Sequence, residues 1–197
     1  MSDESQDDMI SPETYYVFKP SLVGAFMEFR LHTDNIEWRG GRFTRRIFYR
    51  DVRKVRMSFR PVTNENYRFV TEIWPKTGGK FLIASTSWRG LVQQERHNAG
   101  YTAFVRELHR RIGAAGAAAE FRAGSPTLLY WPGVAVFAGL CIGIVALAAQ
   151  SLQGDAFLGF ALVGAVMVFF LWQMANFFRR NLPGTYRPDA LPLRALP

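Results

Sequence analysis

Cysteine and histidine, which supply many catalytic and metal-binding sites, are scarce in this sequence. Its 197 residues include one cysteine, Cys141, and three histidines, His32, His97 and His109, which lie far apart along the chain. A single cysteine excludes an intramolecular disulfide and a cysteine-based metal cluster, and nothing in the sequence demands an oxidising compartment. We interpret all three histidines as surface or edge residues of a folded domain.

Motifs for catalysis are also missing. The sequence contains no HExxH, Walker, GxSxG or CxxC pattern. Gly78 and Gly79 precede Lys80, but no helical pattern follows them, so they indicate a hairpin turn and not a phosphate-binding loop. Because an enzyme needs a positioned acid, base, nucleophile or metal, we expect a chain with no enzymatic activity, no catalytic residues, no metal site and no cofactor.

Charge is absent from two long stretches in the C-terminal third of the chain. Residues 128–150 and 156–178 each form a run of 23 residues without Asp, Glu, Lys or Arg. A helix needs ~20 residues to cross a hydrocarbon core. The alternative, two core helices of a globular protein, is disfavoured because the rest of the chain is too small to bury both. The runs predict two transmembrane helices, which the five residues 151–155 join as an antiparallel hairpin.

The distribution of positive charge gives the hairpin an orientation. Arg122 precedes the first run, Arg179 and Arg180 follow the second, and the connecting segment has no Lys or Arg. Because positive charge stays on the cytoplasmic side, we expect both termini in the cytoplasm. Neither run contains an ionisable Asp, Glu, Lys, Arg or His, which argues against an ion pump, a proton relay, a transporter or a channel.

Small residues recur every four positions in both runs. These residues are Ala135, Gly139 and Gly143 in the first run and Ala161 and Ala165 in the second. Small residues at this spacing let two helices approach closely in lipid, which would pack the hairpin. The other interpretation is that Ala and Gly are simply abundant in such helices, and the sequence does not decide between the two.

The regions outside the two runs divide into a domain and two tails. Residues 1–12 are acidic and polar, without the features of a signal peptide, and we expect a disordered leader. Residues 13–113 form the domain, and residues 114–127 are a linker or a helix extension, with a slight preference for helix because of their alanines. The Pro-rich tail, residues 179–197, is either extended and docked on the domain or flexible.

The pattern within residues 13–113 is mainly that of β-strands, followed by one helix. Alternation and turn residues predict strands at 25–32, 36–38, 42–49, 52–59, 67–74 and 80–85. Apolar residues at Tyr101, Phe104, Val105, Leu108 and Ile112 share one face of a helix. Short strands closed by a helix predict an α+β domain, a compact antiparallel sandwich or barrel.

Three segments of this domain resemble bacterial pleckstrin-homology-like (PH-like) domains. RRIFYRDVRKV at 45–55 is similar to the Ile-x-Tyr-x-Asp-Ile-x-x-Val run of that family, and GKFLI at 79–83 and YTAFVRELH at 101–109 also follow its pattern. The resemblance covers residues 15–112 and implies a PH-like fold with a C-terminal capping helix. Many bacterial members are tethered to transmembrane helices. The segment 87–99 departs from the family as a longer insert before the helix.

Cations are the most prominent polar feature of the domain. Residues 39–60 contain nine Lys or Arg and one acid, Asp51. Strand alternation places Arg42, Arg46 and Arg50 on one side, and Arg56 and Arg60 on one side of the next strand, opposite Phe43, Ile47, Tyr49, Val55, Met57 and Phe59. The candidate binding residues on this predicted arginine face are Arg39, Arg42, Arg46, Arg50, Arg53, Arg56 and Arg60.

Three interpretations of the arginine face remain open. It is a solvated strand face with partners elsewhere, a contact surface for anionic phospholipid, or a docking surface for an acidic protein. No nucleic-acid-binding motif occurs, so nucleic acid is not expected as a partner.

The sequence leaves two candidate functions. The first is a non-catalytic binding or scaffold module anchored in the bacterial inner (plasma) membrane; the second is an accessory subunit of a larger membrane complex or homo-oligomer.

Overall fold

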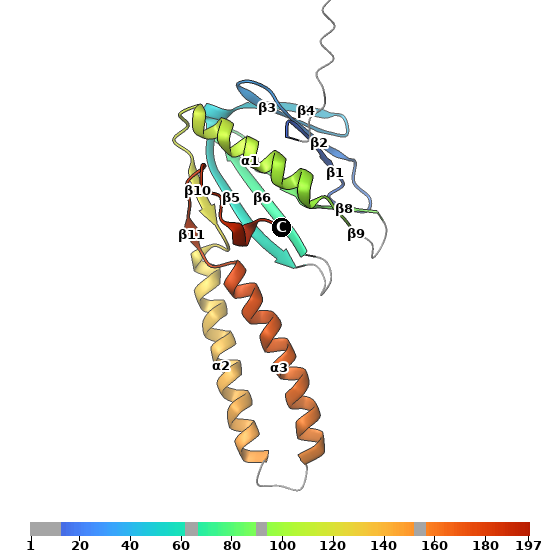
Figure 1. Ribbon diagram of the computed structural model, residues 1–197, viewed down its shortest axis with the longest axis vertical. Helices are drawn as coiled ribbons and strands as arrows, with labels where there is room; N and C mark the ends of the chain where they lie inside the picture. The colour runs from blue at the N-terminus through green and yellow to red at the C-terminus, as the bar shows by residue number, and fades with distance from the viewer. Residues whose placement is uncertain (1–12, 62–66, 90–93, 152–156) are drawn as a thin grey trace, which may run out of the picture.

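The computed structural model describes residues 13–61, 67–89, 94–151 and 157–197 and shows an α+β fold (Figure 1). In this part of the chain β-sheets form a domain, and three α-helices accompany them: one packs against the sheets and two extend away from them. The predicted leader, residues 1–12, lies outside the described residues.

The first sheet is antiparallel and contains four strands in chain order. Its strands are β1 (Tyr15–Phe18), β2 (Met27–Leu31), β3 (Asn35–Gly40) and β4 (Phe43–Phe48). Alternation places Phe29, Ile36 and Ile47 on the inner face, where all three are buried. The alternation at 25–32 and 36–38 therefore predicted β2 and β3 correctly.

The second sheet contains five strands in the order β11-β10-β5-β6-β7. Its strands are β5 (Val52–Pro61), β6 (Tyr67–Pro75), β7 (Phe81–Ala84), β10 (Glu120–Ala123) and β11 (Gly184–Thr185). Strands β5, β6 and β7 confirm the predicted strands at 52–59, 67–74 and 80–85. Within the 87–99 insert, β8 (Thr86–Trp88) pairs with β9 (Gln94–Arg96) and leads into the first helix.

A turn of 3-10 helix, Tyr49–Asp51, carries the chain from the first sheet to the second. The Tyr49 side chain is buried, and its Oη donates a hydrogen bond of 2.8 Å to the His32 carbonyl. The strand predicted over 42–49 therefore ends at Phe48. Its predicted inner face is wrong at Phe43, which is 74% exposed because it begins β4 beside a tight turn.

Helix α1 (Asn98–Ala114) lies diagonally across the sheets and closes the core (Figure 1). The five residues predicted to share its apolar face are all fully buried, which confirms the predicted helix. Phe29 of the first sheet stacks on Phe81 of the second at 5.9 Å between ring centroids and meets Phe104 of α1 at 6.4 Å. One hydrophobic core therefore joins both sheets and α1.

The domain does not end at residue 113. The Ala-rich tract 114–124 was expected to favour helix, but α1 ends at Ala114. The chain then turns at Gly116, whose φ is +61°, and continues as β10. The tail after the second long helix is docked: it supplies β11 and a 3-10 turn (Leu193–Ala195), and Ala195 and Leu196 are buried in the core. The two long helices are thus inserted within the domain, between β10 and β11.

The inserted helices are α2 (Thr127–Ser151) and α3 (Phe157–Arg180), which lie side by side (Figure 1). Tyr130 and Phe137 contact Phe178 near the domain, at 5.7 and 5.3 Å between ring centroids. By length and composition, one helix of the described part is apolar enough to cross a membrane, at Thr127–Ala146 of α2. Most of the predicted connection, 151–155, lies outside the described residues.

The predicted packing of small residues between the helices is wrong for α2. Ala135, Gly139 and Gly143 are exposed, and a Cβ added at either glycine would meet nothing within 4 Å in the described part of the chain. The contact uses Gly133 instead, where a Cβ would lie 3.4 Å from the Phe178 ring. Near the domain, the contact between the helices is made by the aromatic rings of Tyr130, Phe137 and Phe178. Ala165 is exposed, and the side chain of Ala161 lies outside the described set.

Candidate functional site

The predicted arginine face does not exist as one surface, because its residues belong to two sheets. Arg39 and Arg46 lie on β3 and β4 of the first sheet, whereas Arg56 and Arg60 lie on β5 of the second. The 3-10 turn at 49–51 lies between β4 and β5 and carries the chain from one sheet to the other. Each sheet places some of these arginines beside a different buried carboxylate.

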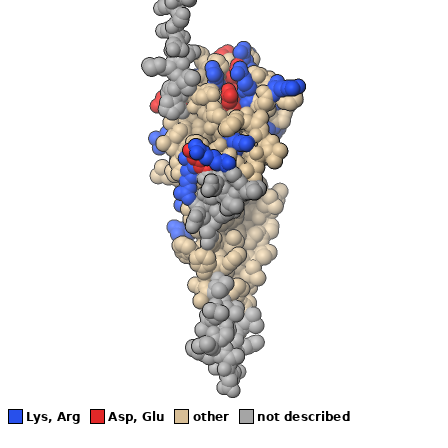
Figure 2. All heavy atoms as spheres, turned by 90° about the vertical axis from the view of Figure 1, so that its right-hand side faces the viewer, with Lys and Arg blue, Asp and Glu red and all other residues tan. Residues whose placement is uncertain are grey.

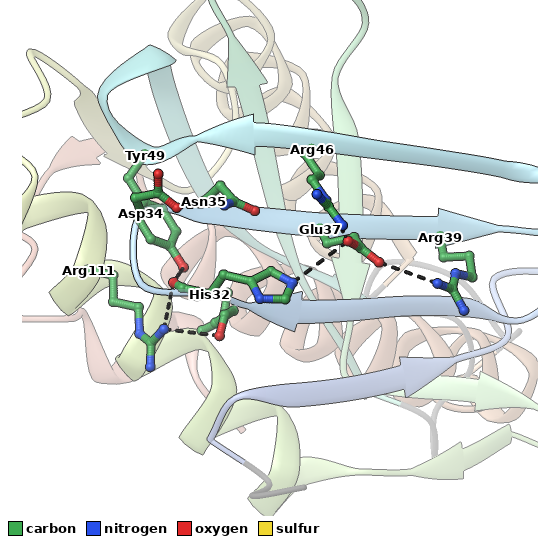
Figure 3. A network of polar contacts seen from close by, with 9 residues as sticks. His32, Asp34, Asn35, Glu37, Arg39, Arg46, Tyr49 and Arg111 are labelled. Atoms are coloured by element: carbon green, nitrogen blue, oxygen red, sulfur yellow. Dashed lines mark hydrogen bonds and ion pairs between the residues drawn. The ribbon is translucent and has the colours of Figure 1, made fainter. Parts of the chain in front are cut away.

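Glu37 is the carboxylate on the first sheet, and it is 7% exposed (Figure 3). Arg46, directly opposite in the register, donates from Nε to Glu37 Oε2 at 2.7 Å. Arg39 Nη2 lies 3.4 Å from Oε1, and His32 Nε2 lies 3.7 Å from Oε2. The hydrogen bond from Arg46 holds the pKa of Glu37 below its ordinary value. Arg39 and Arg46 are therefore engaged within the fold.

The same network continues to the end of α1 (Figure 3). Arg111 donates from Nη1 to the carbonyls of Leu31 at 3.0 Å and His32 at 2.7 Å. Glu107 accepts from Arg111 Nε at 2.6 Å and also pairs with Arg110, and these hydrogen bonds lower the pKa of Glu107 to about 2. Arg111 and its partners thus link α1 to the turn between β2 and β3.

The second sheet holds its cations around Glu72 and Trp74 on its outer face. Glu72 is 2% exposed and accepts from Lys80 Nζ at 2.8 Å, with Arg60 Nη2 at 3.2 Å. The Trp74 ring lies beneath Lys54 at 5.2 Å, Arg56 at 5.5 Å and Lys80 at 5.5 Å from its centroid. These are cation–π distances. Burial lowers the pKa of Lys54, and the charge of Arg56 lowers it further.

We call this surface the basic face of the second sheet. Its cations are Lys54, Arg56, Arg60, Lys80 and Arg122, and its carboxylates are Glu72 and Glu120. Cations therefore outnumber carboxylates on it. In the space-filling view, cations follow one side of the domain down to the level at which the helices begin, and the described helical surface beyond is uncharged (Figure 2).

The helices are fixed to the second sheet at this end. Asn181, directly after α3, accepts from the Phe59 N–H at 3.1 Å and donates to the Phe59 carbonyl at 2.8 Å. Arg180 lies over the rings of Phe59, Tyr67 and Phe69 at 5.0, 5.6 and 5.9 Å. The basic face and the helices thus keep a fixed relation to each other.

Gly124 makes the second connection between the sheet and the helices. Its N–H donates to the Met57 carbonyl at 2.8 Å, and its φ is +78°. A Cβ at this position would lie 2.4 Å from the carbonyl oxygens of Asn181 and Leu182, so only glycine fits. The strand β10 therefore passes into α2 through a tight junction against the chain that leaves α3.

The remaining predicted binding residues, Arg42, Arg50 and Arg53, join neither carboxylate. All three are exposed, and the Arg50 guanidinium lies 5.1 Å from the centroid of the Phe48 ring. Sequence reasoning missed Glu72, Trp74 and Lys80, although alternation along the predicted 67–74 strand and the Gly-Gly turn would have placed them together. It also missed Arg122 as a neighbour of Arg56, because β10 was not predicted.

The interpretation of the histidines as surface residues is wrong for His109. This residue is fully buried; its Nδ1 donates to the Val105 carbonyl at 2.7 Å, and its Nε2 accepts from Tyr186 Oη at 2.8 Å. Burial lowers its pKa to about 4, so the neutral imidazole is the native form near pH 7. A pocket of about 700 Å³ borders this residue, but both ring nitrogens are engaged within the fold, so His109 holds the tail against α1.

Comparisons with protein-family models, with curated proteins and with solved structures give no match. Groups of His, Cys, Asp and Glu that could hold a metal ion are absent from the described residues. The basic face, fixed to the helices, is the candidate functional site.

Proposed function

We propose that this chain is a non-catalytic, membrane-anchored module. Helices α2 and α3 cross the inner (plasma) membrane of a bacterium as a hairpin, with both termini in the cytoplasm. They hold a basic PH-like domain at the cytoplasmic surface, where it contacts anionic phospholipid or an acidic protein. The observation that carries this proposal is the fixed position of the basic face directly beside the origin of the two helices.

The charges around the helix ends support this orientation. Arg122 precedes α2, Arg179 and Arg180 end α3, and all three lie at the end nearest the domain. Positive charge at one end of apolar helices is typical of the cytoplasmic side. Each Lys or Arg close to an anionic leaflet contributes on the order of 1 kcal/mol to membrane attraction. The sheets closed by α1 are compatible with the PH-like resemblance of residues 15–112.

Cysteine labelling tests the topology, because Cys141 is the only cysteine. In a Cys141→Ala background, a cysteine is placed at Gly154, between the helices, or at Thr77, an exposed residue of the domain. We expect an impermeant maleimide to label Gly154→Cys on intact spheroplasts and Thr77→Cys only after permeabilisation. Labelling of Thr77→Cys on intact spheroplasts, or release of the chain from membranes by alkaline carbonate, would contradict the proposal.

A second function is favoured by the open face of α2. Ala135, Gly139 and Gly143 line an exposed helix surface, and the described residues of α3 contribute nothing within 4 Å of the glycine Cβ positions. Small residues at this spacing permit close approach of another helix in lipid. The chain would then act as an accessory subunit that associates through α2 with another membrane protein or with a second copy of itself.

Enlarging the small residues tests this association. We expect Gly139→Leu with Gly143→Leu to reduce the complex to a single chain in mild detergent, as measured by light scattering coupled to gel filtration. Ala138→Leu is the matched control, because residue 138 lies about 100° around the helix from residue 139. A wild-type chain that is already monomeric, or a double variant that keeps the wild-type mass, argues against this function.

A further inference from the structure

A pocket of about 380 Å³ lies where the second sheet meets the two helices. Strands β5 and β10, the start of α2 and the residues after α3 form its walls. Arg56 and Arg122 line it from the sheet, and Thr127 and Trp131 line it from α2. We call it the Arg56–Arg122 pocket. It continues the basic face to the point at which the helices leave the domain.

The described residues balance the positive charge in this pocket only in part. Arg56 and Arg122 are directly opposite in the parallel register of β5 and β10, and like charges in such pairs repel. Arg122 Nη2 has a partner in Glu120 Oε2 at 2.8 Å. Glu72, opposite Arg56 on the other side, is held by Arg60 and Lys80. Among the described residues Arg56 has no ion pair.

The surroundings of Arg56 add to this imbalance. Burial is the largest cause acting on the pKa of its guanidinium and lowers it; the charge of Glu72 opposes this shift, and the charge of Arg122 adds to it. The Arg56 guanidinium is partly buried and lies beside a second cation. An anion bound in the pocket would stabilise both positive charges. Ser125 and Thr127, whose side chains carry neutral hydroxyl donors, also line the pocket.

The apolar side of the pocket indicates the kind of anion. Trp131 is exposed, and so are Leu128 and Leu129 on the same first turns of α2. Tryptophan is enriched at the level of lipid headgroups, and exposed leucine is typical of a surface that faces acyl chains. An occupant of this pocket therefore combines a compact negative charge with apolar chains directly below it.

We propose that the Arg56–Arg122 pocket binds the phosphate group of one anionic phospholipid of the cytoplasmic leaflet. The guanidinium groups of Arg56 and Arg122 hold the phosphate oxygens, which suits their planar donor geometry. The acyl chains then extend along α2 past Trp131. This inference rests on the proposed membrane anchoring and makes the lipid contact specific, since it assigns the contact to a single bound molecule and not to a diffuse surface charge.

Native mass spectrometry of the full chain, released from mild detergent, tests the pocket by counting bound lipids. The chain is titrated with phosphatidylglycerol and, separately, with a diacylglycerol of the same acyl chains, which lacks the phosphate. We expect one tightly bound phosphatidylglycerol and no diacylglycerol. Arg56→Gln with Arg122→Gln should weaken phosphatidylglycerol binding at least about tenfold, because two contacts to the anionic group are lost.

The matched control removes the same charge elsewhere: Arg42→Gln with Arg53→Gln changes two exposed arginines that do not line the pocket. This variant should bind phosphatidylglycerol within about threefold of the wild-type affinity. Circular dichroism checks that both variants are folded, and Arg56→Lys with Arg122→Lys, which keeps the charge, should bind more tightly than the glutamine variant.

Equal loss in the pocket variant and the control would overturn the proposal, as would equal binding of diacylglycerol. Displacement of phosphatidylglycerol by millimolar inorganic phosphate would also overturn it, because the site would then take free phosphate. The maleimide labelling described above decides the anchoring independently. A chain that spans the membrane but binds no phosphatidylglycerol in this pocket refutes only the pocket.

Discussion

Replacing Asn181 by alanine is expected to lower the free energy of unfolding of the full chain by about 4 kcal/mol. Asn181 is 1% exposed, and its side chain pairs with both the N–H and the carbonyl of Phe59 at the edge of β5. Strand β10 pairs with β5 only as far as Met57, so the Asn181 side chain supplies the hydrogen bonds that a longer β10 would make to Phe59. Alanine leaves two buried backbone groups without partners, each of which costs about 2 kcal/mol.

The measurement is the midpoint of urea or thermal unfolding in mild detergent, followed by tryptophan fluorescence. For a chain of this size the expected loss corresponds to a thermal midpoint lower by about 10 °C. Asn98→Ala is the control, since Asn98 is exposed at the start of α1. A shift for Asn181→Ala no larger than that of Asn98→Ala would show that the junction does not stabilise the domain.

This junction matters for the proposed function because the two long helices are inserted within the domain and not appended to its end. A fragment that ends at residue 113 lacks β10, β11 and the core residues Ala195 and Leu196. The domain is complete only when the chain has passed through both helices and returned. A rigid return through Asn181 and Gly124 holds the basic face in one orientation relative to the helices, which a flexible linker would not do.

The sequence predicted the central strands and the apolar face of α1 because their signals are local. Alternation over five to ten residues identified β2, β3, β5 and β6, and the spacing of apolar residues identified the helix. Strand β1 was missed because its four residues, YYVF, show no polar alternation. The two residues of β11 are too few to give any periodicity.

Strand β10 was missed for a different reason. The segment from 114 to 124 is rich in alanine, and its local propensity favours helix. Pairing with the free edge of β5 outweighs that preference, and a partner more than sixty residues away along the chain leaves no local signal. The PH-like resemblance covers residues 15–112 and therefore does not include the segment that forms β10.

The candidate site was predicted in composition but not in arrangement. Of the arginines predicted at 39–60, Arg56 and Arg60 belong to the basic face. The other arginines are separated onto two sheets by the 3-10 turn that begins at Tyr49. The Tyr49 side chain is buried in the folded domain, and strand alternation alone does not predict that burial. The pocket itself needs β10 and the residues after α3, so strand alternation alone does not reveal it.

Acidification is expected to destabilise the folded chain below pH 6.5 through His109. The native pKa of this residue is about 4, lowered by burial from an ordinary value of 6.5. Below pH 6.5 the unfolded chain therefore takes up a proton that the folded chain does not. Stability is complete above pH 6.5 and falls as the pH falls toward 4, by on the order of 2 kcal/mol between pH 7 and pH 5.

The physical cause of this dependence is the environment that the returning tail provides. In the neutral form, His109 donates to the Val105 carbonyl and accepts from Tyr186 Oη, so a second proton on Nε2 would break the bond to Tyr186. It would also place a charge on a side chain with no exposed surface. Protonation thus works against the contact that attaches the tail to α1.

Unfolding midpoints at pH 7, 6 and 5 check the prediction, because the titration of Glu107, whose pKa is lowered to about 2, affects stability only below about pH 4.5. His109→Gln cannot take up the proton and should be less stable than wild type at pH 7 but should lose little further stability by pH 5. His32→Gln, at a side chain 46% exposed, is the matched control and should keep the wild-type slope. If His109→Gln retains the full acid dependence, another group is responsible, and the tail is not held by a neutral imidazole.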